Sequence, residues 1–231
     1  MIDFHAHILP GMDDGSKNPE ESARLLRALR EQGVDKVIAT PHFYANKEDP
    51  DTFLQRRETA WNAIDYDSQT MPEVVLGTEV SYFSGLCHSK ELHKLCVTGT
   101  RLLLIEMPFR SWTSREVASV CALQSWHGIL PILAHVERYR KRGQFLTYRK
   151  QLARQGLCFQ CNAEFFLQRW DKIQALRWLK HGEIHMLGSD CHNMDSRPPE
   201  LGQAAQMIQK KCGQRTLDRL DTIAQELLDF F

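Results

Sequence analysis

The sequence has no excess of charge of either sign, which limits the partners that it can hold. It contains 29 Lys and Arg residues and 29 Asp and Glu residues among 231 positions, so its formal net charge is zero. Proteins that bind nucleic acids or anionic membranes do so mainly through a surplus of basic side chains. We therefore expect no nucleic-acid partner, although a local basic patch is compatible with this balance.

Long apolar runs and linkers are also missing. No stretch approaches the ~20 consecutive apolar residues of a membrane-spanning helix, so we expect no membrane insertion. Candidate ligands occur from His5 onward, which leaves no room for a signal peptide, and we expect a cytoplasmic protein. Without repeats, low-complexity segments or linkers, residues 1–231 are predicted to form a single domain.

The cysteines do not form a regular framework. They are odd in number and irregularly spaced, at positions 87, 96, 121, 158, 161, 191 and 212. A chain of this length needs no disulfide staples, so we interpret them as reduced thiols. Cys158 and Cys161 form a single C-x-x-C, whereas a structural zinc site would need a second ligand pair that is missing. We therefore expect these two cysteines to be ordinary strand residues.

Ligand-type residues are instead concentrated in the opening segment, MIDFHAHILPGMDD. Alternate side chains of a strand point the same way, so the Cα atoms of His5 and His7 lie about 6.5 Å apart and their side chains can share a metal ion. The turn-forming segment 9–15 brings Asp13 and Asp14 back toward them. Taken alone, the two histidines are also compatible with a buried strand in which they are merely hydrogen-bonded.

Short β-rich runs alternate with helical patterns along the rest of the chain. The runs lie near residues 2–7, 36–40, 74–78, 101–105, 129–134, 157–161 and 184–188. The helical patterns lie near residues 18–33, 51–67, 113–126, 143–155, 171–180, 199–211 and 216–231, and segment 84–98 is ambiguous. Such alternation predicts an α/β fold with a parallel sheet and right-handed crossovers. The number of runs favours a closed barrel over an open sheet.

Almost every predicted strand is followed by a potential metal ligand at its C-terminal end. These residues are His5, His7, His42, Glu79, Glu106, His135, Asp190 and His192. Any one of them has a simpler explanation, such as a capping carboxylate or a buried histidine, but the repeated pattern does not. In a β/α barrel the C-terminal strand ends converge on one mouth. Mixed imidazole and carboxylate ligands suit zinc, manganese or iron, so the sequence predicts a multinuclear metal site.

Several strings resemble motifs of the polymerase and histidinol phosphatase (PHP) superfamily, namely His5-Ala-His7, Thr40-Pro-His42, Gly77-Thr-Glu79, Ala134-His135 and Gly188-Ser-Asp190-Cys-His192. Longer strings resemble its bacterial branch of manganese-dependent protein-tyrosine phosphatases associated with capsule and exopolysaccharide synthesis. These strings cover residues 7–15, 104–108, 132–139 and 197–199. The resemblance spans the chain from residue 1 to about residue 200.

The resemblance implies a distorted seven-stranded β/α barrel, a (β/α)7 relative of the TIM barrel known as the PHP fold. It also implies three metal ions, with manganese as the expected metal and iron or zinc as alternatives. The first ion would be held by His5, His7, Glu79 and Asp190. The second would be held by Glu79, as a bridge, with Glu106 and His135. The third would be held by Asp14, His42 and His192, while the substrate phosphate would be bound by Arg138 and Arg197.

The implied activity is hydrolysis of protein phosphotyrosine, with the C-terminal tail of an autophosphorylated bacterial tyrosine kinase as the expected partner. Two adjacent cations lower the pKa of a bridging water, which gives a hydroxide for in-line attack on phosphorus. The planar guanidinium groups suit the non-bridging phosphate oxygens. Asp14 or a metal-bound water would protonate the tyrosyl leaving group.

Three other functions compete with this interpretation. A small-molecule phosphatase of the histidinol phosphate type would use the same metal site, with a deep pocket and a carboxylate that recognises the amine. A phosphodiesterase or exonuclease is disfavoured by the neutral net charge, because binding to a nucleic-acid backbone needs many cations. A non-catalytic regulatory module would retain metal for folding alone, and we would expect its ligand set to be incomplete.

Three further features of the sequence need separate interpretation. Cys191 and Arg197 satisfy the C-x5-R spacing of cysteine-dependent phosphatases, but no glycine lies between them to form a phosphate-cradling loop, so we interpret the match as a coincidence. Val136 stands where the family usually has proline, and Cys161 and Cys191 also depart from its usual pattern. The apolar stripe of segment 216–231 predicts a helix docked on the fold, although a homo-oligomer is compatible with it.

Overall fold

The computed structural model describes residues 1–142 and 144–230, so Gly143 and Phe231, which belong to two predicted helices, lie outside the described residues. Within these ranges the chain forms nine short strands. They are β1 (Ile2–Ala6), β2 (Lys36–Ala39), β3 (His42–Phe43), β4 (Glu73–Leu76), β5 (Glu79–Ser81), β6 (Leu102–Glu106), β7 (Leu130–Leu133), β8 (Cys158–Asn162) and β9 (Met186–Gly188). All seven predicted runs contain strand, and two of the strands, β2 and β4, continue after a short interruption as β3 and β5, which lie beyond the predicted runs.

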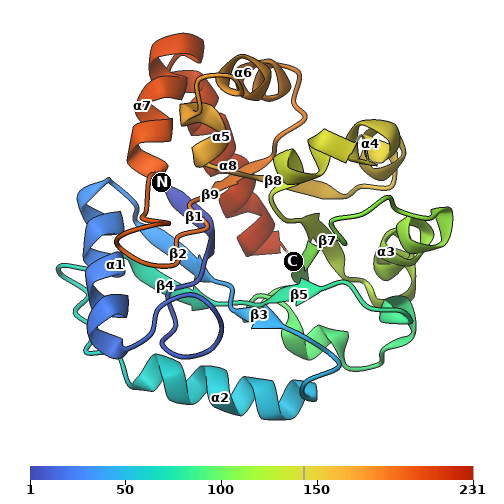
Figure 1. Ribbon diagram of the computed structural model, residues 1–231, viewed down its shortest axis with the longest axis horizontal. Helices are drawn as coiled ribbons and strands as arrows, with labels where there is room; N and C mark the ends of the chain where they lie inside the picture. Colours follow the sequence, from blue (N-terminus) through green and yellow to red (C-terminus); the bar gives the residue numbers. More distant parts are fainter. Residues whose placement is uncertain (143, 231) are drawn as a thin grey trace.

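The strands form one curled parallel layer. Three pair in the order β1-β2-β4 and six in the order β3-β5-β6-β7-β8-β9. The ring closes beyond β9, where the backbone N–H of Asp190 donates to the carbonyl of His5 at 2.7 Å. The N–H of His7 donates to the carbonyl of Cys191 at 3.0 Å. The strands therefore form the predicted α/β barrel, with helices around them (Figure 1).

Two splits, one between β2 and β3 and the other between β4 and β5, lie side by side. They redirect the chain at the C-terminal edge of the sheet. Pro41 has no N–H to donate to a neighbouring strand, so the ladder is interrupted between β2 and β3. The neighbouring split, between β4 and β5, contains Gly77, where an added Cβ would lie 3.0 Å from Ile38. After both splits the register places His42 opposite Glu79. The splits thus deliver two predicted ligands to adjacent positions.

Eight α-helices occur in the described residues. They are α1 (Pro19–Glu31), α2 (Pro50–Asn62), α3 (Ser114–His127), α4 (Gln144–Arg154), α5 (Glu164–Leu167), α6 (Lys172–Lys180), α7 (Leu201–Cys212) and α8 (Gln214–Phe230). Asn18 caps α1 by accepting from the N–H of Glu21 at 2.9 Å, and Thr113 and Glu116 form a capping box on α3. Segment 84–98, whose pattern is ambiguous, contains two short 3₁₀ helices, η1 (Leu86–His88) and η2 (Leu92–Leu95).

Helix α8 packs against the strands, as the apolar stripe of the sequence predicts. Leu217 and Leu220 are buried, and Ala224 joins a core cluster with strand residues such as Phe4 and Ile132. Figure 1 shows α8 crossing behind the strands, with its C-terminal end near the centre of the view. The helix therefore closes the barrel on the side away from the C-terminal strand ends. None of the helices in the described ranges is both long and apolar enough to cross a membrane.

Candidate metal centre

The C-terminal strand ends and the loops after them bring all nine predicted ligands into one cluster. Their ligand atoms fall into three groups, within each of which all atoms lie within 4.8 Å of one another. The first group is His5, His7 and Asp190; the second is Glu79, Glu106 and His135; the third is His7, Asp14, His42 and His192. The groups follow the implied ligand sets closely. They differ in two respects: Glu79 belongs to the second group but not to the first, and His7 belongs to both the first and the third.

Glu79 lies at the junction of the three groups and is 1% exposed. Its Oε2 lies 3.2 Å from Nε2 of both His5 and His7 and 3.1 Å from Nδ1 of His42. Its Oε1 lies 2.9 Å from Nε2 of His135. A carboxylate that faces four imidazoles from two oxygens is placed to bridge two metal ions.

The distances in the cluster fit metal coordination. Bonds of about 2.0 to 2.2 Å to one ion separate neighbouring ligand atoms by about 3 to 3.5 Å. Nε2 of His5 lies 3.0 Å from Nε2 of His7, and each lies 3.2 Å from Glu79. Two buried nitrogens, Nδ1 of His42 and Nε2 of His192, have no hydrogen-bond partner among the described residues. Because buried polar atoms are normally satisfied, a metal ion at these nitrogens fits the site.

Burial favours the neutral form of two imidazoles in the third group, those of His42 and His192. Burial lowers the pKa of His192 to about 4, and the charge of His7 acts in the same direction. Burial also lowers the pKa of His42 below its ordinary value. Metal binding requires the neutral form of imidazole, so neither side chain would have to lose a proton at neutral pH before binding an ion.

Residues outside the predicted ligand set orient the first histidines. Nδ1 of His7 lies 2.7 Å from Oδ2 of Asp13, which also accepts from the N–H of His42 at 2.8 Å. Nδ1 of His5 lies 3.1 Å from Oε1 of Gln160. A hydrogen bond at Nδ1 leaves Nε2 free to bind a metal ion. The neighbouring Asp14 has an exposed side chain, and its Oδ1 lies 3.5 Å from Nε2 of His192. The two adjacent aspartates therefore contact the imidazoles of different histidines.

Two ligand positions have strained backbones. His135 and Asp190 have φ angles of 32° and 52° and are the non-glycine residues with positive φ in the described part of the chain. Each lies two residues after the end of a strand, β7 and β9 respectively. Such conformations persist where the surrounding structure imposes them and are concentrated at functional sites.

The position of Gly188 predicts a loss of stability when a side chain is added. A Cβ there would lie 2.6 Å from both Nε2 of Gln160 and Cβ of His5. We expect Gly188→Ala to lower the free energy of unfolding by about 1 to 3 kcal/mol, because crowding of a packed site costs this much. Chemical denaturation followed by circular dichroism measures this change, and an unchanged midpoint would contradict the contact.

Asp190 connects the ligand cluster to two arginines. Its Oδ1 lies 3.7 Å from Nε2 of His5, while its Oδ2 accepts from Arg138, from Arg197 at 2.7 Å and from Asn162 at 2.7 Å. Burial alone would raise the pKa of Asp190, but the charges of His5 and Arg138 hold it below its ordinary value. The arginines are about one-third exposed, so they can also bind an anion beside the cluster.

Comparison with known proteins decides the family. The sequence profile described as "Capsular polysaccharide synthesis, CpsB/CapC" matches residues 1–228. The chain belongs to the CpsB/CapC family. The resemblance to capsule-associated phosphatases of the PHP type is thereby confirmed at the level of the family.

Relatives within the CpsB/CapC family match nearly the whole chain. The tyrosine-protein phosphatase CpsB of Streptococcus pneumoniae is 30% identical over 237 residues, which cover 95% of this chain and 94% of the relative. The tyrosine-protein phosphatase YwqE of Bacillus subtilis is 27% identical, covering 99% and 91%. A structure from a study of YwqE and CpsB as metal-dependent tyrosine phosphatases superposes with a TM-score of 0.81 at 26% identity, covering 99% and 94%.

The cysteine beside the ligands of this CpsB/CapC chain has no features of a nucleophile. Cys191 is fully buried, and burial raises the pKa of its thiol far above the ordinary value. Since the thiolate is the reactive form, the C-x5-R spacing gives no reactive cysteine. We expect Cys191→Ser to retain phosphatase turnover within a few-fold, measured in parallel with metal content. Complete loss of turnover with all metal still bound would contradict this expectation.

Proposed function

We propose that the protein is a metal-dependent protein-tyrosine phosphatase, formed by residues 1–231 as a single domain. The observation that carries the proposal is the position of Asp190, whose two oxygens face the imidazole cluster and the two arginines respectively. A phosphate bound by the arginines would therefore lie against the metal ligands. The names of the relatives, all tyrosine-protein phosphatases, support the same activity.

The three ligand groups would each hold a divalent ion, with Glu79 between them. Bound ions supply Lewis acidity, which activates water as the nucleophile and neutralises phosphate charge. We propose manganese, with iron or zinc as alternatives, because imidazole and carboxylate donors accept all three. Asp13 and Gln160 hold the first histidines in the tautomer that presents Nε2.

The arginines would bind and orient the phosphate. Arg138 and Arg197 approach Asp190 from η3 (Val136–Arg142) and from the loop after β9, so their guanidinium groups converge on one point. Planar guanidinium groups pair with two phosphate oxygens at once and fix the phosphorus for in-line attack. Asp14, whose carboxylate is exposed at the mouth, is proposed to relay a proton from solvent to the leaving tyrosyl oxygen.

The exposure pattern favours a protein substrate over a small molecule. The buried part of the cluster is His5, His7, Glu79, His135, Asp190 and His192. Solvent reaches the cluster at Asp14, which is exposed, and at Arg138 and Arg197, which are partly exposed. The ligands thus lie directly below the surface on this side. A phosphotyrosine on a polypeptide would reach them without the whole chain entering a closed pocket.

The family supports a proposal for the biological partner. Its profile is named for capsular polysaccharide synthesis. We propose that the substrate is phosphotyrosine in the C-terminal tail of a bacterial tyrosine kinase that regulates capsule or exopolysaccharide synthesis. This reaction would take place in the cytoplasm.

Hydrolysis assays with three substrates test the proposal. A tyrosine-phosphorylated peptide, histidinol phosphate and a nucleotide diester are each incubated with the protein, with manganese and again after chelation. We expect turnover of the peptide that disappears on chelation. Metal-dependent turnover of histidinol phosphate or the diester alone would support the proposed metal site but refute phosphotyrosine as the substrate. No turnover of any of them would favour the non-catalytic regulatory module.

A further inference from the structure

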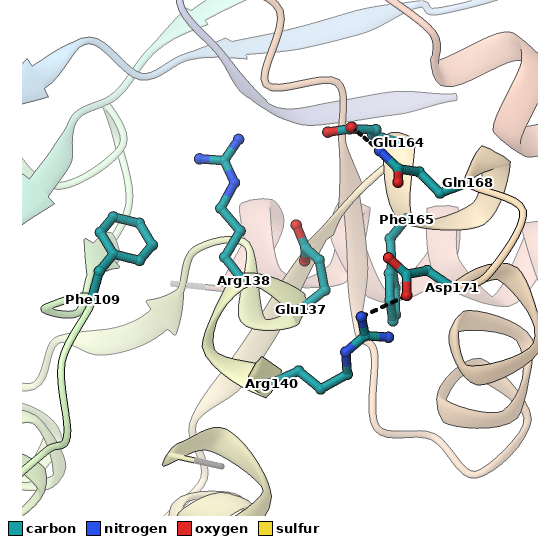
Figure 2. Close-up of a pocket in the computed structure, with 8 residues that line it drawn as sticks. All are labelled: Phe109, Glu137, Arg138, Arg140, Glu164, Phe165, Gln168 and Asp171. Atoms are coloured by element: carbon teal, nitrogen blue, oxygen red, sulfur yellow. Dashed lines mark hydrogen bonds and ion pairs between the residues drawn. The ribbon is translucent and has the colours of Figure 1, made fainter. Parts of the chain in front are cut away.

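A cavity of about 360 Å³ lies beside the candidate metal centre. Its wall is formed by Phe109, Glu137, Arg138, Arg140, Glu164, Phe165, Gln168 and Asp171 (Figure 2). Volumes of this size bind small organic groups. None of the proposed metal ligands lines the cavity, so it is a separate feature from the metal centre.

Arg138 joins the cavity to the metal centre. Its side chain lines the cavity, and its guanidinium donates to Oδ2 of Asp190. An ester phosphate bound at this guanidinium would therefore have its organic group at the opening of the cavity. What the cavity accepts then determines which phosphate esters are bound.

Phe109 forms one wall of the cavity as an aromatic surface supported from behind. The residue lies three positions after Glu106 in the sequence. Its ring stacks on that of His135, with the ring centroids 5.7 Å apart and an angle of 20° between the ring planes. Its ring also lies 5.5 Å from that of Tyr139, yet the residue remains 47% exposed. In Figure 2 the ring lies across the cavity from Phe165, with Arg138 between the two. The ring is therefore held in place and still accessible.

The charged groups on the opposite wall are bonded to one another. Arg140 donates to Asp171 at 2.5 Å and also lies over the ring of Phe165. Gln168 donates to Glu164. Phe165 on that wall is buried, whereas Phe109 is 47% exposed, so Phe109 offers the larger apolar contact surface to a bound group. A neutral aromatic ring fits that surface better than a charged or aliphatic group does.

We infer that this cavity binds the aromatic ring of an aryl phosphate and that Phe109 is a specificity-determining residue, on which the ring stacks. This inference rests on the phosphatase function proposed above and names the cavity and the residue that would select its substrate. Offset or edge-on aromatic pairs add attraction beyond the burial of area. Phosphoserine has no ring to make this contact, so tyrosyl phosphates are selected.

Binding of two phosphonates that cannot be hydrolysed tests the inference. Benzylphosphonate carries a ring and methylphosphonate does not, and calorimetry gives the dissociation constant of each for the manganese-loaded protein. We expect the wild type to prefer benzylphosphonate, and we expect Phe109→Ala to weaken its binding about tenfold without changing methylphosphonate binding. Phe109→Trp, which keeps an aromatic surface, should retain the preference.

Phe230→Ala is the matched control, because it removes an exposed phenylalanine at the end of α8. It should leave both dissociation constants unchanged. A wild type without preference for the ring, or equal effects of Phe109→Ala on both phosphonates, would overturn the inference. The binding result is independent of turnover. If the preference for the ring depends on Phe109 but the protein does not hydrolyse phosphotyrosine, the proposed function is refuted and the aryl-binding site is still supported.

Discussion

Replacing Glu79 by glutamine is expected to reduce turnover of a phosphotyrosine peptide by about 1000-fold or more. The amide keeps the size of the side chain but removes the charge that faces His5, His7, His42 and His135. Divalent ions contribute several kcal/mol to stabilising the transition state, and each 1.36 kcal/mol is a factor of ten in rate. Because Glu79 lies at the junction of the groups, the variant should also retain fewer metal ions per chain.

Steady-state kinetics and elemental analysis of the purified protein measure these two effects. Glu73→Gln is the matched control, since this carboxylate lies at the start of β4 and is largely exposed. Circular dichroism should show that both variants are folded. Wild-type turnover in Glu79→Gln would refute the assignment of the metal centre, whereas loss in both variants would point to a general effect on folding.

Replacing Arg138 by methionine is expected to lower kcat/KM for the phosphotyrosine peptide by about 100- to 1000-fold. Loss of one donor to a developing anionic charge has an effect of this size in enzymes. Asp190 would still accept from Arg197 and Asn162, so this proposed metal ligand should stay in place. The effect should therefore appear with metal content unchanged, together with weaker inhibition by inorganic phosphate.

Arg149→Met is the control for this experiment. Arg149 is partly exposed like Arg138, but it lies on α4 and pairs with Glu183 at 3.3 Å. Combining Arg138→Met with Arg197→Met should cost less than the two single effects together, because both arginines contact the same oxygen of Asp190. If Arg138→Met loses bound metal while its affinity for phosphate is unchanged, the proposed role of Arg138 in binding phosphate is contradicted.

The sequence contained the topology and the ligand types. Alternating β-rich and helical segments leave few ways to fold other than a parallel sheet, and the C-terminal ends of parallel strands meet on one side. For this reason His5, Glu79 and Asp190, far apart in the sequence, could be predicted to lie together. Their residue types then indicated a metal centre without any knowledge of distances.

Other parts of the site depended on packing that local patterns do not describe. Gln160 and Asn162 look like ordinary polar strand residues, and only the approach of β8 to β1 and β9 puts them beside His5 and Asp190. Asp13 and Asp14 are adjacent, so the sequence offered no means of telling which one bonds His7. The signal that could have found Asp13 is its position in the tight turn before Gly15, whose N–H it accepts.

Phe109 shows the same limit for specificity. In the sequence it is one apolar residue after a strand, and a buried core position would be the simpler interpretation. Its partial exposure and its stacking on His135 result from the path of the loop between β6 and α3. The kind of chemistry could therefore be predicted from residue types and strand order, because residue types are given by the sequence and strand order follows from local patterns and chain topology. The tertiary structure decided which groups touch, because contacts depend on how distant segments pack.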